Sequence, residues 1–265
     1  MLKQRVITAV ILAPLVLAGL FGLTGGAFAL FTGAIVLIGA WEWVNLAGYA
    51  NSKLRIAGVL GMAVAMALLW YTGQVHSAWP LWVAAVGWAL NLYWVVAYPE
   101  HQAQWATSAR RLAMGVWVLL PCWVGFIVLR ESGAVWLLFL LLLVWCADTG
   151  AYFAGRRFGK RKLAVHVSPA KSWEGVLGGM AATTLLALIF AVWLSLGVGE
   201  TLVLVIITWA VSLVSVLGDL FESMLKRTRG IKDSSALLPG HGGVLDRIDS
   251  LTAAVPLFAL LWLVL

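Results

Sequence analysis

Nine apolar runs of 16 to 23 residues recur along the 265-residue chain, and they decide what it can fold into. They cover residues 6–24, 27–47, 56–72, 79–98, 112–129, 134–154, 174–196, 201–221 and 250–265. A helix that crosses a bilayer needs about 20 such residues, because hydrocarbon offers no partner to an unpaired backbone N–H or C=O. Only 11% of the residues are charged, against about 25% in soluble domains. We therefore expect an all-α, polytopic integral membrane protein with about nine transmembrane helices.

The runs also predict how the chain is divided. The first run follows a basic start, as in a signal peptide, but it exceeds the usual 7–15 apolar residues, so we expect a retained span. The ninth run is short and is expected to begin earlier, within the polar stretch before it. The two longest polar connections, 155–173 and 222–249, are too short to bury a core. We expect one membrane unit in two parts, residues 1–133 with helices 1–5 of unassigned function and residues 134–265 with helices 6–9.

Lys and Arg are distributed unevenly over the connections. With nine spans, 17 of the 18 fall on one side of the membrane and only Arg130 falls on the other. Basic connections stay in the cytoplasm, so this side is predicted to be cytoplasmic and the C-terminus to lie outside. Anionic headgroups suffice to explain the net charge of +7. No nucleic-acid partner is expected, because no folded cytoplasmic domain is predicted.

Four aspartates are predicted to lie at membrane depth on the same side. Asp148 falls near the end of the sixth run and Asp219 near the end of the eighth. Asp246 and Asp249 share a helix face at the start of the ninth. A charge in hydrocarbon costs roughly 3 kcal/mol, so these acids need partners. Pairing with a nearby cation such as Arg247 is one interpretation, but four acids on one side favour a Mg²⁺ site, since hard cations prefer carboxylate oxygens.

Cations and glycines flank these acids. Lys171 follows a Ser-Pro turn in "SPAKSWEGVLGG", where Ser168 is either a substrate contact or the cap of the next helix. Gly242 and Gly243 let backbone N–H groups approach an anion closely, near a helix N-terminus. Aspartates, a divalent cation, Lys and Arg and a glycine pair together predict a polyphosphate ligand. Two further glycines have the spacing of a helix-packing face: Gly175 and Gly179.

The stretch "SMLKRTRGIKDSSALLPGHGGVLDRID", residues 223–249, closely resembles the signature of phosphatidate cytidylyltransferases, also called CDP-diacylglycerol synthases. That signature runs Ser, then after two residues Lys-Arg, then Lys-Asp, Pro-x-His-Gly-Gly and Asp-Arg-x-Asp. Its fixed positions are all present: Ser223, Lys226, Arg227, Lys232, Asp233, Pro239, His241, Gly242, Gly243, Asp246, Arg247 and Asp249. "SPAKSWEG" and "ADTGAYFAG" resemble two further motifs of the family, whereas the first five runs match only in being apolar.

The resemblance implies a reaction of phospholipid biosynthesis. CTP and phosphatidic acid would give CDP-diacylglycerol and pyrophosphate, with Mg²⁺ and a second, monovalent cation such as K⁺. The implied metal ligands are Asp148, Asp219, Asp246 and Asp249. The implied catalytic residues are Asp219, Lys232, Asp246 and Asp249. The implied substrate contacts are Ser168, Lys171, Ser223, Lys226, Arg227, His241, Gly242, Gly243 and Arg247.

Some expectations stay open or general. His241 would either donate to a phosphate or stabilise a turn by hydrogen bonding, and Asp233 would orient Lys232 or the base. The expected partners are the two substrates and membrane lipids, and a homodimer is left open. The expected location is the inner membrane of a bacterium, with the active site on the cytoplasmic side.

Two other functions deserve comparison. A CTP-dependent membrane lipid kinase has related motifs and would transfer the γ-phosphate, but the complete signature at 223–249 argues against it. An ion-coupled transporter also uses acids within the membrane. Transporters usually show paired repeats, with polar residues near the midplane in both halves, whereas the acids here gather in the C-terminal half at one face.

Overall fold

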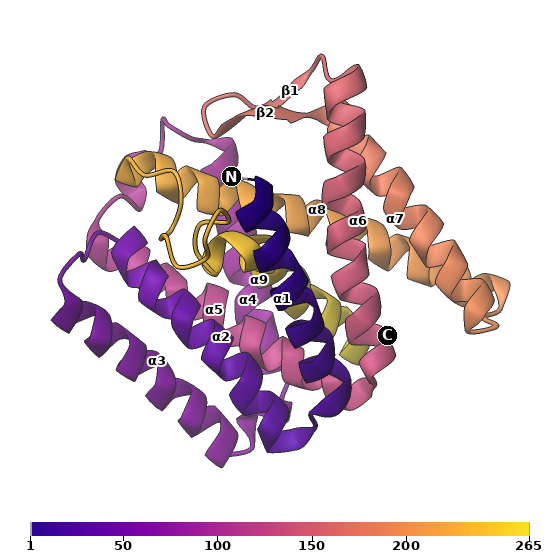
Figure 1. The fold of residues 1–265 in the computed structure, drawn as a ribbon, viewed down its shortest axis with the longest axis horizontal. Coiled ribbons are helices and arrows are strands. Elements are labelled where there is room, and N and C mark those ends of the chain that lie inside the picture. The colour runs from indigo at the N-terminus through magenta and orange to yellow at the C-terminus, as the bar shows by residue number, and fades with distance from the viewer. Residues whose placement is uncertain (1, 265) are drawn as a thin grey trace.

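The computed structural model describes residues 2–264 and, of the side chains, those of residue 8 and residues 10–264. Within that part, nine α-helices make up nearly the whole fold (Figure 1). They are α1 (Leu2–Gly22), α2 (Gly25–Leu46), α3 (Ser52–Tyr71), α4 (Trp79–Val96), α5 (Ser108–Ser132), α6 (Ala134–Phe158), α7 (Trp173–Trp193), α8 (Val198–Arg229) and α9 (Leu245–Val264). Short 3₁₀ turns lie at Gln74–His76 and Gln102–Gln104. The prediction of an all-α membrane protein is confirmed.

Eight of these helices, α2 to α9, are long and apolar enough to cross a membrane. In α1 the apolar segment Val10–Gly22 is too short to cross a membrane by itself. The side chains before it lie outside the described residues, apart from that of residue 8. Each predicted span overlaps one helix. The ninth helix does begin before its apolar run, at Leu245, as predicted.

The predicted polar connection 222–249 is wrong at both ends, because α8 continues to Arg229 and α9 starts at Leu245. The described connection is only 230–244. Polar residues in this part of α8 follow helical spacing, and Lys226 pairs with Glu222, four residues earlier, at 3.0 Å. The helix ends at Gly230, whose φ of 73° is left-handed. Half of the twelve fixed positions of the signature therefore lie on the ends of α8 and α9, and the other half lie in the connection 230–244.

The connection between α6 and α7 contains a small antiparallel hairpin that we did not predict. Its strands are β1 (Lys162–Ala164) and β2 (Ser168–Ser172). The hairpin leads directly into α7, whose N-cap is Ser172; the Ser172 hydroxyl accepts a hydrogen bond from the Gly175 N–H at 3.2 Å. The alternative that Ser168 caps this helix is therefore wrong, since Ser168 lies at the other end of β2.

Close packing of α6 against α7 fixes the position of the hairpin (Figure 1). A Cβ at Gly179 would lie 2.7 Å from the carbonyl oxygen of Ala147, and one at Gly175 would lie 3.0 Å from that of Ala151. The main chains touch because these positions have no side chain, which confirms the predicted packing face. α8 and α9 also pack together.

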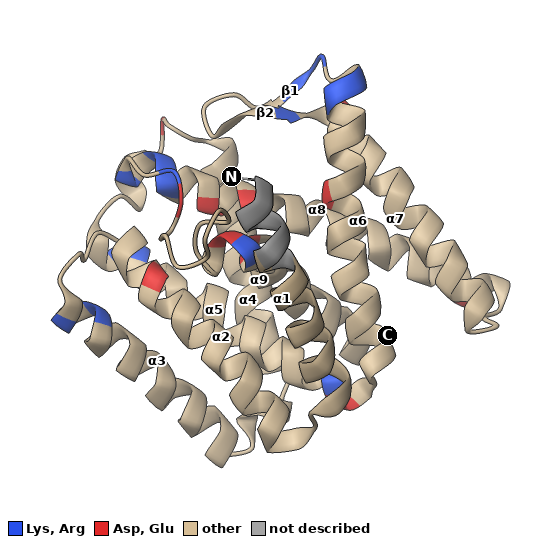
Figure 2. Cartoon of the chain, viewed as in Figure 1, with Lys and Arg blue, Asp and Glu red and all other residues tan. Residues whose placement is uncertain are grey.

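Lys and Arg gather toward the end of the bundle where α6 and α8 end and where α3 begins (Figure 2). Arg130 lies in the last turn of α5, at the other end of the bundle. The first two predicted cations, Lys3 and Arg5, have side chains outside the described residues. The described arrangement agrees with the charge asymmetry read from the sequence.

Candidate active site

A cavity of about 500 Å³ brings together three of the predicted site residues, Asp148 of α6, Lys171 of β2 and Asp219 of α8. The Lys171 ammonium lies 2.6 Å from Asp219 Oδ2. The Ser223 hydroxyl donates to Asp219 Oδ1 at 3.2 Å. The side chains of Lys171 and Asp219 remain 25% and 32% exposed. This ion pair therefore borders open space, where an anionic ligand could reach the lysine.

A second cluster surrounds Lys226. Its ammonium donates to Glu222 Oε2 at 3.0 Å and to Asp246 Oδ1 at 2.7 Å. The three side chains are almost buried, with 14%, 3% and 5% exposure for Lys226, Glu222 and Asp246. Glu222 was not among our site residues, although its helical spacing from Asp219 placed it on the same face. Two carboxylates for one ammonium leave this cluster with excess negative charge.

Asp249 completes the acidic group from α9. Its carboxylate is near enough to those of Asp219 and Glu222 to interact electrostatically with both. Its Oδ1 accepts a hydrogen bond from the Ser250 N–H at 2.8 Å. This proximity depends on Gly218, because a Cβ there would lie 2.5 Å from the Asp249 carbonyl oxygen. The close approach of α8 and α9 thus brings their acids together.

The donor chemistry of this group suits a hard cation such as Mg²⁺, which prefers carboxylate oxygens. Glu222 Oε1 is buried and has no hydrogen-bond partner, so a ligand atom is free. Among the described side chains, however, no three of His, Cys, Asp and Glu are grouped so that they could hold a metal ion. Lys171 and Lys226 instead pair with Asp219 and Asp246. The four-aspartate metal site stays a prediction.

The other oxygen of Asp246 organises the connection 230–244. Asp246 Oδ2 accepts from the Ser234 N–H at 2.9 Å, the Ser234 hydroxyl at 2.8 Å and the Gly243 N–H at 2.7 Å. Asp246 lies in the first turn of α9, where a carboxylate is favoured by the helix dipole. One residue of the signature thus holds both the lysine of α8 and the segment before α9.

His241 lies at the turn of this segment. The Leu238 N–H donates to the Gly242 carbonyl at 2.8 Å, and the His241 N–H donates to the Leu238 carbonyl at 2.9 Å. Gly242 has a φ of 83°, which favours glycine. The imidazole Nδ1 is buried without a hydrogen-bond partner. The turn is held by the backbone of His241, and a contact between its ring and phosphate stays a prediction.

A second cavity of about 640 Å³ is lined by this turn and by further signature residues: Lys232, Asp233, His241, Gly242 and Arg247. Lys232 and Arg247 are exposed. Arg227 and Ser168 line neither this cavity nor the first one. Arg227 instead donates to the Val167 carbonyl at 3.4 Å and so ties α8 to the hairpin connection. Cations beside a glycine turn make the second cavity suitable for phosphates.

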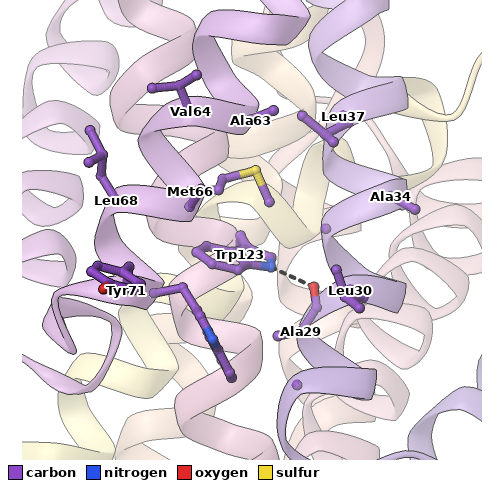
Figure 3. A pocket seen from close by; sticks show the side chains of 14 residues that line it. Ala29, Leu30, Ala34, Leu37, Ala63, Val64, Met66, Leu68, Tyr71 and Trp123 are labelled. Carbon is purple, nitrogen blue, oxygen red and sulfur yellow. Dashed lines mark hydrogen bonds between the residues drawn. The ribbon is translucent and has the colours of Figure 1, made fainter.

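A larger cavity of about 870 Å³ lies between α2 and α3 (Figure 3). Its walls are apolar apart from Tyr71 and two Trp side chains, one of which, Trp123, donates to the Ala29 carbonyl at 2.9 Å. No charged side chain lines it. This cavity therefore does not suit a phosphate ligand, despite its size.

One residue that contacts the site comes from the half of the chain without motifs. Glu42 of α2 is fully buried and accepts hydrogen bonds from Ser234, Ser235, Val244 and Leu245. We did not predict its role. The available signal was a lone acid within the second apolar run, in "GAWEWVNL".

Comparison with known proteins extends over the whole chain. The sequence matches the model of the Cytidylyltransferase family over residues 3–265. It is 51% identical to the phosphatidate cytidylyltransferase of Pseudomonas aeruginosa, over 99% of this chain and 97% of that protein. It is 43% identical to the phosphatidate cytidylyltransferase of Haemophilus influenzae and 33% identical to that of Staphylococcus epidermidis, each over 98% of both chains. The protein is thus a member of the cytidylyltransferase family, in its first five helices as well as in its motifs.

Proposed function

We propose that the protein transfers the cytidylyl group of CTP to phosphatidic acid, giving CDP-diacylglycerol and pyrophosphate in phospholipid biosynthesis. The observation that carries this function is the 51% identity, over nearly the full length, to a phosphatidate cytidylyltransferase. The arrangement of the signature supports it, because Lys171 and Asp219 border one cavity and Lys232 and Arg247 border another.

The reaction needs charge neutralisation more than acid–base catalysis. A phosphate oxygen of the lipid attacks the α-phosphorus of CTP; the new O–P bond forms as the bond to the β-phosphate oxygen breaks. The nucleophile is already an anion, so no side chain has to remove a proton from it. The barrier lies in bringing two anions together and in stabilising the pyrophosphate that leaves, which positioned cations accomplish.

The position of each cationic side chain indicates which part of the reaction it would serve. Lys171, at the open cavity, would screen the attacking phosphate after leaving Asp219 for its ligand. Lys232 and Arg247 would hold the phosphates of CTP beside the Gly242 turn. Lys226 is almost buried, and its main effect would be to hold Glu222 and Asp246 in place.

The proposal includes two cations. Mg²⁺ would be held by the aspartates, and the second cation would be a monovalent ion such as K⁺. When bound, these ions would neutralise phosphate charge. Asp219, Asp246 and Asp249 would hold them, together with Asp148. The unpaired oxygen of Glu222 supports a cation in this group.

Charge, hydropathy and the bacterial relatives support a proposal for the location. Eight described helices are apolar enough to cross a membrane, and the relatives are bacterial. We place the protein in the inner membrane with its site facing the cytoplasm, because Lys and Arg gather at the end of the bundle that carries the signature (Figure 2).

Purified protein in lipid vesicles tests this function. With CTP labelled at the α-phosphate, phosphatidic acid should yield a labelled lipid and one pyrophosphate per turnover, and EDTA should stop the reaction. A lipid kinase would release labelled CDP and leave the lipid unlabelled, whereas a transporter would convert neither substrate. Omission of phosphatidic acid is the control. Labelled CDP with an unlabelled lipid, or no conversion of either substrate, would refute the proposal if it is seen with wild-type protein.

A further inference from the structure

Glu42 is a carboxylate buried among hydrogen-bond donors. Its Oε1 accepts from the Ser235 hydroxyl at 2.6 Å and from the Val244 N–H at 3.1 Å. Its Oε2 accepts from the Ser234 hydroxyl at 3.1 Å and from the Leu245 N–H at 2.6 Å. The side chain has 0% exposure, and no ion pair joins it to a Lys or Arg whose side chain is described. A buried charge persists only where such partners replace water.

These donors are the start of α9 and the segment just before it. The N–H groups at the start of a helix have no partner inside the helix, and its dipole favours a negative charge there. Glu42 provides that charge from α2, about 200 residues earlier in the chain. The start of α9 is thus capped by a side chain of a different helix, and its own Asp246 adds a second negative charge in the first turn.

The same contacts connect Glu42 to the acidic cluster. The Ser234 hydroxyl lies 3.1 Å from Glu42 Oε2 and 2.8 Å from Asp246 Oδ2, so the two acids share one hydroxyl group. Asp246 in turn holds Lys226 through its other oxygen. Gly243 leaves the space for this arrangement, because a Cβ there would lie 2.6 Å from both oxygens of Glu42.

We propose that Glu42 is a positioning residue of the transferase reaction: it holds the segment 232–246 so that Lys232 and Asp246 are correctly placed. It acts through Ser234 and the start of α9, and none of its described contacts is to a cavity-lining cation. This inference rests on the proposed function. It gives the otherwise motif-free first half of the chain a defined part in the site.

The hydrogen bonds of Glu42 allow its positioning role to be distinguished from simple packing by substitution. A glutamine at position 42 has the size of glutamate but replaces one oxygen with an NH₂ group. Each carboxylate oxygen faces one backbone N–H, that of Val244 or that of Leu245. Either orientation of the amide therefore sets a donor against a donor. An alanine instead leaves space that water can enter to solvate both N–H groups.

The test compares Glu42→Gln, Glu42→Ala and Glu200→Gln in vesicles. Glu200 also caps a helix start, accepting from the Gly197 N–H at 2.8 Å, but at the first turn of α8, away from the signature. We expect Glu42→Gln to lower kcat at least tenfold and as much as Glu42→Ala or more, with Glu200→Gln unchanged. Hydrogen exchange should become at least tenfold faster for amides 234–246 in the Gln variant and stay unchanged for 168–193.

Wild-type turnover and wild-type exchange in Glu42→Gln would overturn the proposal, and so would an impaired Ala variant beside an active Gln variant, since that pattern means packing alone. The exchange measurement needs no substrate. It therefore still decides the role of Glu42 if the wild-type protein makes no CDP-diacylglycerol, a result that would refute only the proposed function.

If the Glu42 variants do not fold, Gly243→Ala provides the same test without altering α2. Its methyl group would lie 2.1 Å from the Ser234 hydroxyl and 2.6 Å from both Glu42 oxygens, so it would break the contact between these two side chains. The same local increase in exchange is expected, together with lower kcat. Wild-type exchange at 234–246 in this variant would overturn the proposal.

Discussion

At the scale of single residues, the two lysine–aspartate pairs differ in burial, and this predicts two kinds of loss. Lys226→Met would leave Glu222 and Asp246 buried without a cation, which costs about 3–5 kcal/mol of stability. Lys171→Met, in the open cavity, should cost at most about 1 kcal/mol but lower turnover at least a hundredfold.

Thermal unfolding in detergent measures the loss of stability, and CTP turnover measures the loss of activity. Lys53→Met, at an exposed position at the start of α3, is the control for loss of a lysine. Equal destabilisation by both site variants would contradict the difference in burial.

The four aspartates give a second residue-scale prediction. Asp→Asn keeps the shape and removes the charge, so each change should lower turnover at least a hundredfold if the acids hold cations that neutralise phosphate. Asp246 and Asp249 should be least tolerant because they share a face of α9, and Asp148, which is exposed in the first cavity, should be most tolerant. Turnover is measured over a range of Mg²⁺ concentrations, with Glu131→Gln, at the far end of α5, as control. Wild-type turnover in both α9 variants would exclude this metal site.

At the scale of helices, the contact between α6 and α7 holds Asp148 and Lys171 at one cavity. Gly179→Val should push the helices apart, since even a Cβ would lie 2.7 Å from the Ala147 carbonyl oxygen. We expect a loss of about 1–3 kcal/mol from overpacking and at least tenfold lower turnover. Gly61→Val in α3 is the matched control, because nothing lies within 4 Å of a Cβ at that position. Thermal unfolding and turnover check both. An active, stable Gly179→Val would show that the close contact is unnecessary.

For the molecule as a whole, charge asymmetry predicts which ends face the cytoplasm. A cysteine at Ala236, which is exposed in the signature segment, should react with an impermeant maleimide only in inside-out vesicles. One at Ser132, exposed at the end of α5, should react in intact cells. The partly exposed Cys146 is first replaced by alanine. Reaction of both positions from one side would refute the topology.

The sequence predicted the helices well because the need to satisfy the backbone in hydrocarbon is a local constraint, readable from each apolar run. It named the residues of the signature but not their pairings, since Lys226 contacts Glu222 and Asp246 rather than open space. The hairpin between α6 and α7 was missed because its strands are short and mostly polar. The only local signal for Glu42 was its position as a lone acid in an apolar run, and its partners could not be read from it because they lie about 200 residues away.

The contact between Glu42 and Leu245 also has a consequence for how the protein is made. The two residues are 203 positions apart. At about 5–20 residues per second, a ribosome needs roughly 10–40 s to travel that distance. During this time α2 is inserted before the hydrogen-bond partners of Glu42 exist. Glu42 lies only four residues from the end of α2, close enough to the bilayer surface for water to solvate its carboxylate until those partners are made. The burial of Glu42 is therefore completed only when the last helix has been translated and inserted.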